Sequence, residues 1–386
     1  MGKIVSNNEL KNLQPEQWKY TNLNLLKNYN SNFIPQNKVL NKDNDGADII
    51  IYNGQVIGCG EKIKSKDIQI YNINEALEKN INNVNILFNK ISIKNQNLFI
   101  ENNTNNCNSG YYLFISDDLE LIDTITIKNI VDQGDENSFL NYRNFIHCGK
   151  NVRATILNEE IYSVNQCINI VCETHVSENS KLEIINHNEK PNTKQIYNFY
   201  GCINKNSKLI HHVLDISGNI LKNNYYIDLD KTGSEYLFNG LNISNNKEHY
   251  DNYIQINHNS PYTISNLNYK IVANQNSKSI LFAKSIINEN SFSSEAYQKN
   301  NNLILSDRAR VHSNPQLEIY NDDVKCSHGS ATGQIDDDAI YYMRTRGIDN
   351  QTAKKLILNS FVNEILNEIS HLEIQDNLKH IIKNYL

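Results

Sequence analysis

The stretch "NKNSKLIHHVL" (residues 204–214) carries the pattern that decides the fold, because related phrases recur along the middle of the chain. In each copy a turn-forming or polar residue precedes a small or apolar residue, then usually a Lys or Arg, and then a new apolar run. An imperfect period of this kind in strand-rich sequence is typical of the stacked coils of a β-solenoid. A β-sandwich with similar turns is the alternative. The turn position is occupied in successive copies by Asn151, Asn179, Asn206, Gly233, Asn276 and Arg308, at separations of 28, 27, 27, 43 and 32 residues.

Short strands are predicted around these phrases. Alternating apolar and polar residues indicate strands in "NLFIENN" (97–103), "KLEIINH" (181–187) and "QLEIYND" (316–322). Nearer the N-terminus, "ADIIIYNGQVIGC" (47–59) predicts a hairpin, because apolar residues flank the turn pair Asn53-Gly54. We therefore expect a mainly β protein whose β-helix core covers residues 46–334, with the coils clearest from residue 90.

The N-terminal part, residues 1–45, is predicted to be a helical segment. Pro15 stands where the first turn of a helix tolerates proline. The residues that follow can form a partly apolar helical face, which consists of Trp18, Leu23, Leu25 and Leu26.

The C-terminal part, residues 335–386, is predicted to be a helical domain. Asp336 is a suitable N-cap for a helix over residues 337–346, and Gly347 stands at its C′ position. Asp349 can cap a second helix, and residues 374–386 can form a third. Such helices either cap the open end of the solenoid or provide a docking surface for a partner. The second helix has an apolar stripe with a period near 3.6, made of Ala353, Leu356, Ile357, Phe361, Ile365 and Ile369.

Composition excludes several classes of protein. The 386 residues carry a formal net charge of −6, so nucleic acid is not an expected partner. The sequence contains no run of about 18 apolar residues, and the first residues lack the apolar region of a signal peptide, so we expect no membrane association. The seven cysteines include no CxxC pair, which favours a reducing compartment and a cytoplasmic protein.

Cys326 and His328 are the strongest candidates for a functional site. They lie two residues apart in "VKCSHGSATG", so on a strand both side chains share one face with Val324, while Ser327 points away. A thiolate and an imidazole are suitable ligands for zinc, copper or iron–sulfur clusters. Two ligands do not complete a tetrahedral site, so further ligands would have to come from another coil or another chain. A purely structural pair is the alternative.

Other reactive side chains are weaker candidates. His249 and Asp251 are also two residues apart, so the carboxylate could orient the imidazole, with His258 farther along the same stretch. A polar ladder inside the solenoid is the alternative interpretation. We interpret the three residues Cys167, Cys172 and His175, and the pair His211 and His212, as buried structural residues, because their spacings split them across the two faces of a strand.

The sequence contains no GxGxxG, Walker A or GxSxG motif, so no nucleotide is expected to bind this chain. A carbohydrate-active β-helix enzyme would need a cluster of carboxylates that recurs at the spacing of the coils. We find no such cluster, and this class remains a minor alternative.

The stretch "LEIYNDDVKCSHGSATGQIDDDAIYYMRTRGI" (317–348) closely resembles the C-terminal signature of the SufB/SufD family of iron–sulfur cluster assembly proteins, on its SufD side. The stretches "EQWKYTNL", "HYDNYIQINHNSP" and "EAYQKNNNLILSDRARVHSNPQ" resemble family segments in the family's order. The family usually has Ala-Thr directly after the Cys-Ser-His-Gly run, whereas here Ser330 precedes Ala331. Ala283 stands where the family commonly has Gly.

This resemblance implies a right-handed parallel β-helix flanked by helical ends. It implies a non-enzymatic scaffold that pairs with a SufB-like subunit through the β-helix and docks a SufC-like ABC ATPase through residues 335–386. It also implies that Cys326 and His328 meet a nascent iron–sulfur cluster or iron, held transiently and shared with the partner chain. A homodimeric scaffold that itself holds a cluster is the alternative. Whether the two residues bind iron or only line the interface stays open.

Overall fold

The computed structural model describes residues 15–22, 46–60, 63, 67–90, 92–95, 97–107, 109–132, 139–162 and 167–386. Most of the predicted N-terminal helical segment, with Leu23, Leu25 and Leu26, lies outside the described residues. Inside them, the predicted start at Pro15 is confirmed by helix α1, Pro15–Trp18.

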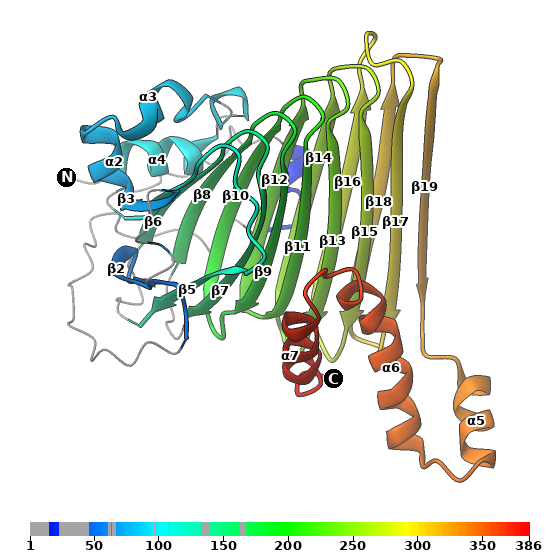
Figure 1. Ribbon diagram of the computed structural model, residues 1–386. Helices are drawn as coiled ribbons and strands as arrows, with labels where there is room; N and C mark the ends of the chain where they lie inside the picture. The colour runs from blue at the N-terminus through cyan, green and yellow to red at the C-terminus, as the bar shows by residue number, and fades with distance from the viewer. Residues whose placement is uncertain are drawn as a thin grey trace.

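The expected parallel β-helix flanked by helices is confirmed (Figure 1). From β4 onward the strands alternate between two sheets along the chain, so each coil contributes one strand to each sheet. The ten-stranded sheet has the order β19-β17-β15-β13-β11-β9-β7-β5-β1-β2, and the nine-stranded sheet has the order β18-β16-β14-β12-β10-β8-β6-β4-β3. The strands are β1 Ile49–Tyr52, β2 Gln55–Cys59, β3 Ile68–Asn72, β4 Tyr111–Ile115, β5 Ile125–Val131, β6 Phe139–Cys148, β7 Arg153–Tyr162, β8 Cys167–Val176, β9 Lys181–Glu189, β10 Lys194–Ile203, β11 Lys208–Ser217, β12 Ile220–Leu229, β13 Glu235–Ser244, β14 His249–His258, β15 Ile264–Ala273, β16 Lys278–Ile287, β17 Ser294–Ile304, β18 Arg310–Ile319 and β19 Val324–Gly333.

The predicted hairpin over residues 47–59 is also confirmed. Strands β1 and β2 are antiparallel, and Asn53 and Gly54 both have positive φ angles, of 49° and 81°. Apart from this pair and the antiparallel pair β3–β4, the strands stack in parallel. The space between the two sheets is filled by apolar side chains from both, such as Leu209, Phe238 and Leu281. Burial of this continuous apolar core is the main force that holds the coils together.

The turn positions predicted from the repeat belong to two corners of the solenoid. Asn151, Asn179, Asn206 and Gly233 precede β7, β9, β11 and β13, and all have positive φ angles. Stacked asparagines are bonded there, with Asn179 Nδ2 donating to Asn151 Oδ1 at 3.2 Å. The assignment of Asn276 and Arg308 to this series was wrong, because they precede β16 and β18 in the other sheet. The series continues at Tyr262 and Ser293, which also have positive φ angles. Tyrosine and serine rarely adopt this conformation, so their residue types did not indicate these turns.

Helices cover the outer face of the nine-stranded sheet near the N-terminus. The strand predicted in "NLFIENN" was wrong, because α4, Leu98–Asn106, begins there. The Asn97 side chain accepts hydrogen bonds from the backbone N–H groups of Phe99 and Ile100, and this cap favours a helix. Ile100 packs on an aromatic row of Tyr200, Tyr226, Tyr253 and Phe282. The neighbouring elements are α2 Ile73–Glu78, η4 Ile81–Asn83, α3 Val84–Leu87 and η5 Ser92–Asn95.

Three C-terminal helices are confirmed, the first two at the predicted start points and the third two residues earlier than expected. They are α5 Asp337–Thr345, α6 Asn350–Leu366 and α7 Leu372–Ile382. Asp336 caps α5, Asp349 caps α6, and Gly347 adopts a φ of 88° after α5. The predicted stripe on α6 was partly wrong, because Leu356 is 45% exposed. The buried face is rotated, and it consists of Ala353, Leu358, Val362, Ile365 and Leu366, with Ile369 just beyond the helix.

The interpretation of these helices as an end cap was also wrong. Helices α6 and α7 pack on the outer face of the ten-stranded sheet, against Leu214, Leu241 and Val272 of β11, β13 and β15. Helix α5 projects from the body and contacts α6 (Figure 1). The end of the solenoid formed by β18 and β19, here called the open end, is covered by no other described element. None of the helices among the described residues has the length and apolar content that a membrane span requires.

Candidate functional site

The site predicted at Cys326 and His328 lies on β19, the last strand of the ten-stranded sheet. In the parallel register with β17, Cys326 is next to Ala296 and His328 is next to Gln298. Ala296 and Gln298 are both buried, because even-numbered residues of β17 point between the sheets. Cys326 and His328 therefore share the inward face, as predicted, and Ser327 points away. Both are accessible because no further described coil covers that side: Cys326 is half-buried and His328 is exposed.

The strand continues past the site. Gly329 does not end the strand, because β19 extends through it to Gly333. Ser330 lies between them on the inward face, and its hydroxyl lies 2.9 Å from the Ser313 hydroxyl of β18. This contact joins the two sheets across the interior at the open end.

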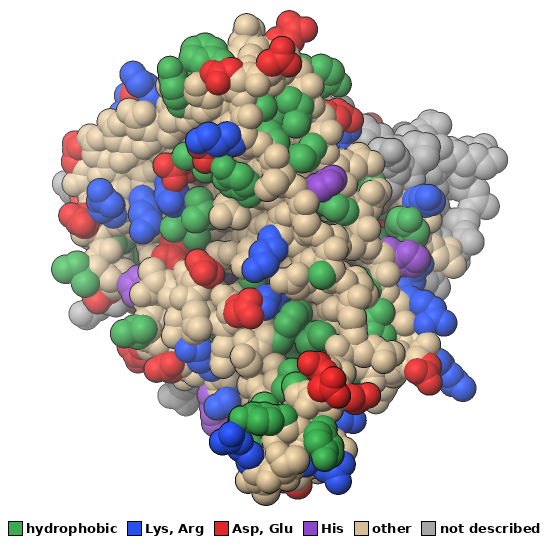
Figure 2. Space-filling model, turned by 90° about the vertical axis from the view of Figure 1, so that its right-hand side faces the viewer, with side chains coloured by type: hydrophobic (Ala, Val, Ile, Leu, Met, Phe, Trp, Pro, Cys, Tyr) green, Lys and Arg blue, Asp and Glu red, His purple; other side chains and the backbone are tan. Residues whose placement is uncertain are grey.

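The open end presents two unpaired strand edges and inward-facing side chains. Val311 of β18 packs against the core and is only partly buried, and Ile319 at the end of the strand is 45% exposed. Figure 2 views the molecule from this side, where hydrophobic patches interrupt a mainly polar surface. Among the described residues no strand pairs with the outer edges of β18 and β19. Unpaired edges with apolar side chains are surfaces on which another chain can continue the sheets.

Two donors from this chain do not form a metal site by themselves. Within the part of the chain that the structure describes, no three His, Cys, Asp or Glu side chains are grouped so that they could hold a metal ion. Burial raises the pKa of Cys326, so the thiol is protonated at neutral pH until a metal or a neighbouring cation favours the thiolate. The pair is therefore suited to supply part of a ligand set and to receive the remainder from outside the chain.

His249 and Asp251 do not form a polar ladder inside the solenoid. They lie on the outer face of the nine-stranded sheet, and both contact Thr21: its hydroxyl donates to Asp251 Oδ2 at 2.5 Å and lies 3.2 Å from His249 Nε2. Asp251 also forms a buried ion pair of 2.9 Å with Lys222. Burial lowers the pKa of His249 to about 4, so the imidazole is neutral. These residues anchor the segment that follows α1.

His258 is separated from this group. It lies in the interior between the hydroxyl groups of Thr263 and Ser265, at 2.7 and 2.8 Å, and burial lowers its pKa to about 3. Of the three residues, only His258 has the interior position that the polar-ladder interpretation assigned to them. Thr21 and Lys222 were missed by the sequence analysis, because they come from positions far apart in the chain.

The remaining candidates are structural, as predicted. All seven cysteines are free. Burial raises the pKa of Cys172 to about 12 and raises that of Cys167 further. His211 and His212 point to opposite faces: burial lowers the pKa of His211 to about 3, whereas His212 Nε2 lies 3.1 Å from Oε1 of Glu183.

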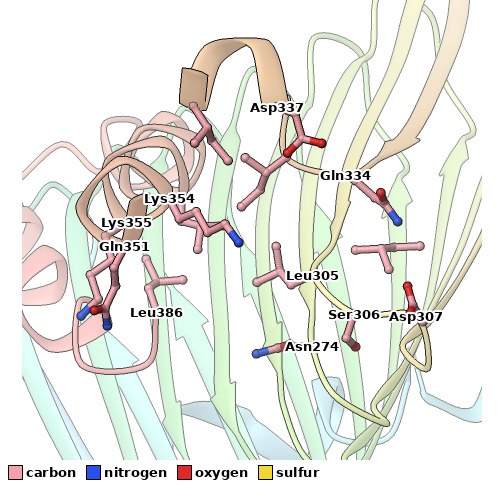
Figure 3. A pocket seen from close by; sticks show the side chains of 14 residues that line it. Asn274, Leu305, Ser306, Asp307, Gln334, Asp337, Gln351, Lys354, Lys355 and Leu386 are labelled. Atoms are coloured by element: carbon pink, nitrogen blue, oxygen red, sulfur yellow. The ribbon is translucent and has the colours of Figure 1, made fainter. Parts of the chain in front are cut away.

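The C-terminal helices leave a second accessible surface. A pocket of about 410 Å³ lies between the β17–β18 turn, the β19–α5 connection and α6 (Figure 3). Leu305 and Leu386 form part of its apolar lining, and Lys354 reaches into it from α6. Beside the pocket, Tyr341 and Tyr342 of α5 are 68% and 57% exposed. Solvent-exposed aromatic residues on a projecting helix are typical of protein–protein contact surfaces.

The base of this helical unit is held to the solenoid by polar contacts. Ser370, between α6 and α7, donates its backbone N–H to Oε1 of Glu183 at 3.1 Å and its hydroxyl to Oε2. His371 Nε2 lies 3.1 Å from the Thr155 hydroxyl. Lys270 of β15 pairs with Glu364 at 2.7 Å. These contacts fix the position of α6 and α7 relative to the sheet.

Comparison with known proteins identifies the family. The family model described as "SUF system FeS cluster assembly, SufBD core domain" matches residues 130–361, which is more than half of the chain. The chain belongs to the SufBD family. This confirms the resemblance found at residues 317–348, and the matched range contains the open end with Cys326 and His328.

Curated SufBD relatives are similar to parts of this chain. The chain is 27% identical over 241 residues to the iron–sulfur cluster assembly protein SufD of Escherichia coli, covering 60% of this chain and 56% of that protein. It is 26% identical over 216 residues to a SufBD family protein of Synechocystis, covering 55% and 48%. It is 27% identical over 142 residues to the SufD of Plasmodium falciparum, covering 36% and 9%. The matched part thus spans about half the length of the first two relatives.

Proposed function

We propose that this SufBD protein is a non-catalytic scaffold subunit for iron–sulfur cluster assembly in the cytoplasm, and that it pairs with a SufB-like chain through its open end. The observation that carries the proposal is the placement of Cys326 and His328 on the inward face of an uncovered last strand. Two donors at such an edge are accessible only until another chain continues the sheets. The partner would then complete the ligand set around iron or a nascent cluster, which is the cargo and not a resident group.

The C-terminal helices are proposed to dock a SufC-like ABC ATPase. Helix α5 stands away from the solenoid, and its two exposed tyrosines lie beside the pocket between α6 and the last coils. Because Glu183 and Lys270 anchor the helical unit to the sheet, a movement imposed on α5 and α6 by a nucleotide-driven partner would be transmitted to β9 and β15. No nucleotide is proposed to bind this chain itself.

Co-expression tests the assembly. We expect the chain to co-purify with a SufB-like chain and a SufC-like ATPase and to have no ATPase activity alone. Tyr341→Ser combined with Leu356→Ser should release the ATPase only. Leu372→Ser on α7, which is at least as exposed as these two residues but distant from α5, should release nothing. Failure of the wild-type chain to bind either partner would overturn the proposal. A homodimer that assembles a cluster without a SufB-like chain would favour the alternative, since the same unpaired edges can meet in a second copy.

Cluster maturation tests the site. Cys326→Ser and His328→Ala should lower the cluster yield of the assembled complex at least tenfold, in the range found when metal ligands lose their support. Ser327→Ala, on the opposite face of the same strand, is the matched control and should leave the yield unchanged. All three variants should keep the thermal unfolding temperature, because the side chains have little burial to lose. Wild-type yield from His328→Ala would show that His328 only lines the interface.

A further inference from the structure

We propose that Gln298 is a positioning residue for His328: its side-chain carbonyl oxygen accepts the imidazole N–H and leaves the other ring nitrogen free to face the partner chain. The inference deepens the proposed function and rests on the role proposed there for His328. The carbonyl oxygen of Gln298, which lies behind the exposed residues Cys326 and His328, is an unpaired buried polar atom.

Gln298 lies directly behind His328 in the solenoid. The two residues are register partners in the parallel pair β17–β19, and their side chains share the inward face. Neighbouring parallel strands are about 4.8 Å apart, which is within reach of a glutamine and a histidine side chain. Gln298 is only 5% exposed, so its polar atoms must find partners inside the protein.

The orientation of the Gln298 amide is determined by its neighbours. The Nε2 group donates to the Ser285 hydroxyl at 2.8 Å and to the backbone carbonyl of Gln316 at 3.1 Å. A carbonyl oxygen can only accept, so the atom beside Gln316 must be the amide nitrogen and the amide cannot be turned over. The carbonyl oxygen Oε1 is buried and has no hydrogen-bond partner.

The residues beside Gln298 leave His328 as the donor for this oxygen. Along the inward face, Cys326 lies next to Ala296, and the Ser330 hydroxyl is already within hydrogen-bond distance of Asn300 and Ser313. The imidazole of His328 has no hydrogen-bond partner among the described residues, although its backbone belongs to the β17–β19 ladder. An unpaired buried acceptor is costly, and an imidazole N–H in the adjacent row removes that cost.

The contact has a chemical consequence for the site. A neutral imidazole carries its proton on one nitrogen and offers a lone pair on the other. If Gln298 holds the protonated nitrogen, the tautomer and the ring orientation are fixed before any metal arrives. Such supporting hydrogen bonds typically alter metal affinity or activity by about 10- to 100-fold when they are lost. Gln298 thus prepares His328 as a ligand without touching the cargo.

NMR of the imidazole nitrogens of His328 in the purified full-length chain tests this directly. Wild type should show one dominant tautomer. Gln298→Met, which keeps the length but removes the acceptor, should give a mixture, and Gln298→Glu, which keeps an acceptor oxygen, should retain the dominant form. The matched control is Asn302→Leu: its Oδ1 is also buried and unpaired, but its register partner is Thr332, so the His328 signals should not change.

The outcomes separate this inference from the proposed function. A tautomer ratio unchanged in Gln298→Met overturns the inference, whatever the cluster yield. If Gln298→Met fails to fold, Gln298→Asn is used, which withdraws the oxygen by one methylene group and should give the same mixture. A changed tautomer ratio together with normal maturation by His328→Ala would support the contact and overturn the role proposed for His328 as a ligand. When both hold, Gln298→Met should lower the cluster yield roughly tenfold and Asn302→Leu should not.

Discussion

One carboxylate, Glu183 of β9, contributes strongly to the attachment of the C-terminal helices to the solenoid. Its side chain is buried and accepts hydrogen bonds from His212 and from both donors of Ser370. Burial by itself would raise the pKa of Glu183, but these donors outweigh it and hold the pKa at about 2, against an ordinary value of 4.5. Each pKa unit is worth about 1.4 kcal/mol, so the ionised carboxylate stabilises the folded state by about 3 kcal/mol.

Glu183→Gln should remove most of this contribution. The Asn239 amide N–H group lies 3.4 Å from His212 Nδ1, so Nδ1 accepts and Nε2 carries the proton that points at residue 183. A glutamine at position 183 either places its own amide N–H against the His212 N–H or accepts from it with its carbonyl oxygen. That oxygen is neutral and forms a weaker hydrogen bond than a carboxylate does. We expect the free energy of local opening of α6 and α7 to fall by about 2–3 kcal/mol, which accelerates their hydrogen exchange about 100-fold.

Hydrogen–deuterium exchange of peptides from residues 350–386 provides the measurement. Because the folded pKa lies below the unfolded one, the stabilisation is complete above about pH 4.5 and is lost as the pH falls toward 2. Wild type should therefore lose protection over this interval more steeply than Glu183→Gln. Glu178→Gln is the control, since Glu178 forms an exposed 3.5 Å pair with Lys150 and should change little. Equal protection of residues 350–386 in Glu183→Gln and wild type would refute the reasoning.

Two further predictions concern the reactivity of the Cys326 thiol and the buried ion pair between Arg143 and Glu173. Iodoacetamide at pH 8 should label Cys326 at least tenfold faster than Cys148, whose pKa burial raises to about 12; mass spectrometry that finds equal rates would contradict the described burial. Arg143→Met should destabilise the protein by about 3–5 kcal/mol in thermal unfolding, because Arg143 and Glu173 form a fully buried 2.7 Å pair. The variant leaves the buried carboxylate without a counter-charge, held only by the backbone N–H groups of Asn89 and Ser92. Adding Glu173→Gln should restore part of that loss, and no recovery would show that the cost comes from packing instead of charge.

The fold was predictable to the extent that it depends on local patterns. Each coil repeats a turn residue before an apolar run, and Asn53-Gly54, Asp336 and Asp349 act within a few residues of their own positions. The errors came from tertiary influences. The alternation in "NLFIENN" alone indicates a strand. These residues form a helix because the Asn97 side chain caps it and because Ile100 has a surface to pack on. The α6 stripe was rotated because Leu358 and Val362 meet the sheet, and a sequence does not reveal which side of a helix will do so.

Some features of the candidate site also follow from the sequence, and others follow only from the tertiary structure. The sequence by itself determined that Cys326 and His328 share a face, because residues two apart on a strand must do so, and it determined the family through a long specific stretch. Only the tertiary structure decided that this face is the inward side of an uncovered last coil, that His249 and Asp251 lie outside the solenoid beneath Thr21, and that Gln298 stands behind His328. These relations join residues from different coils or from distant segments, and they exist only once the coils are stacked in register.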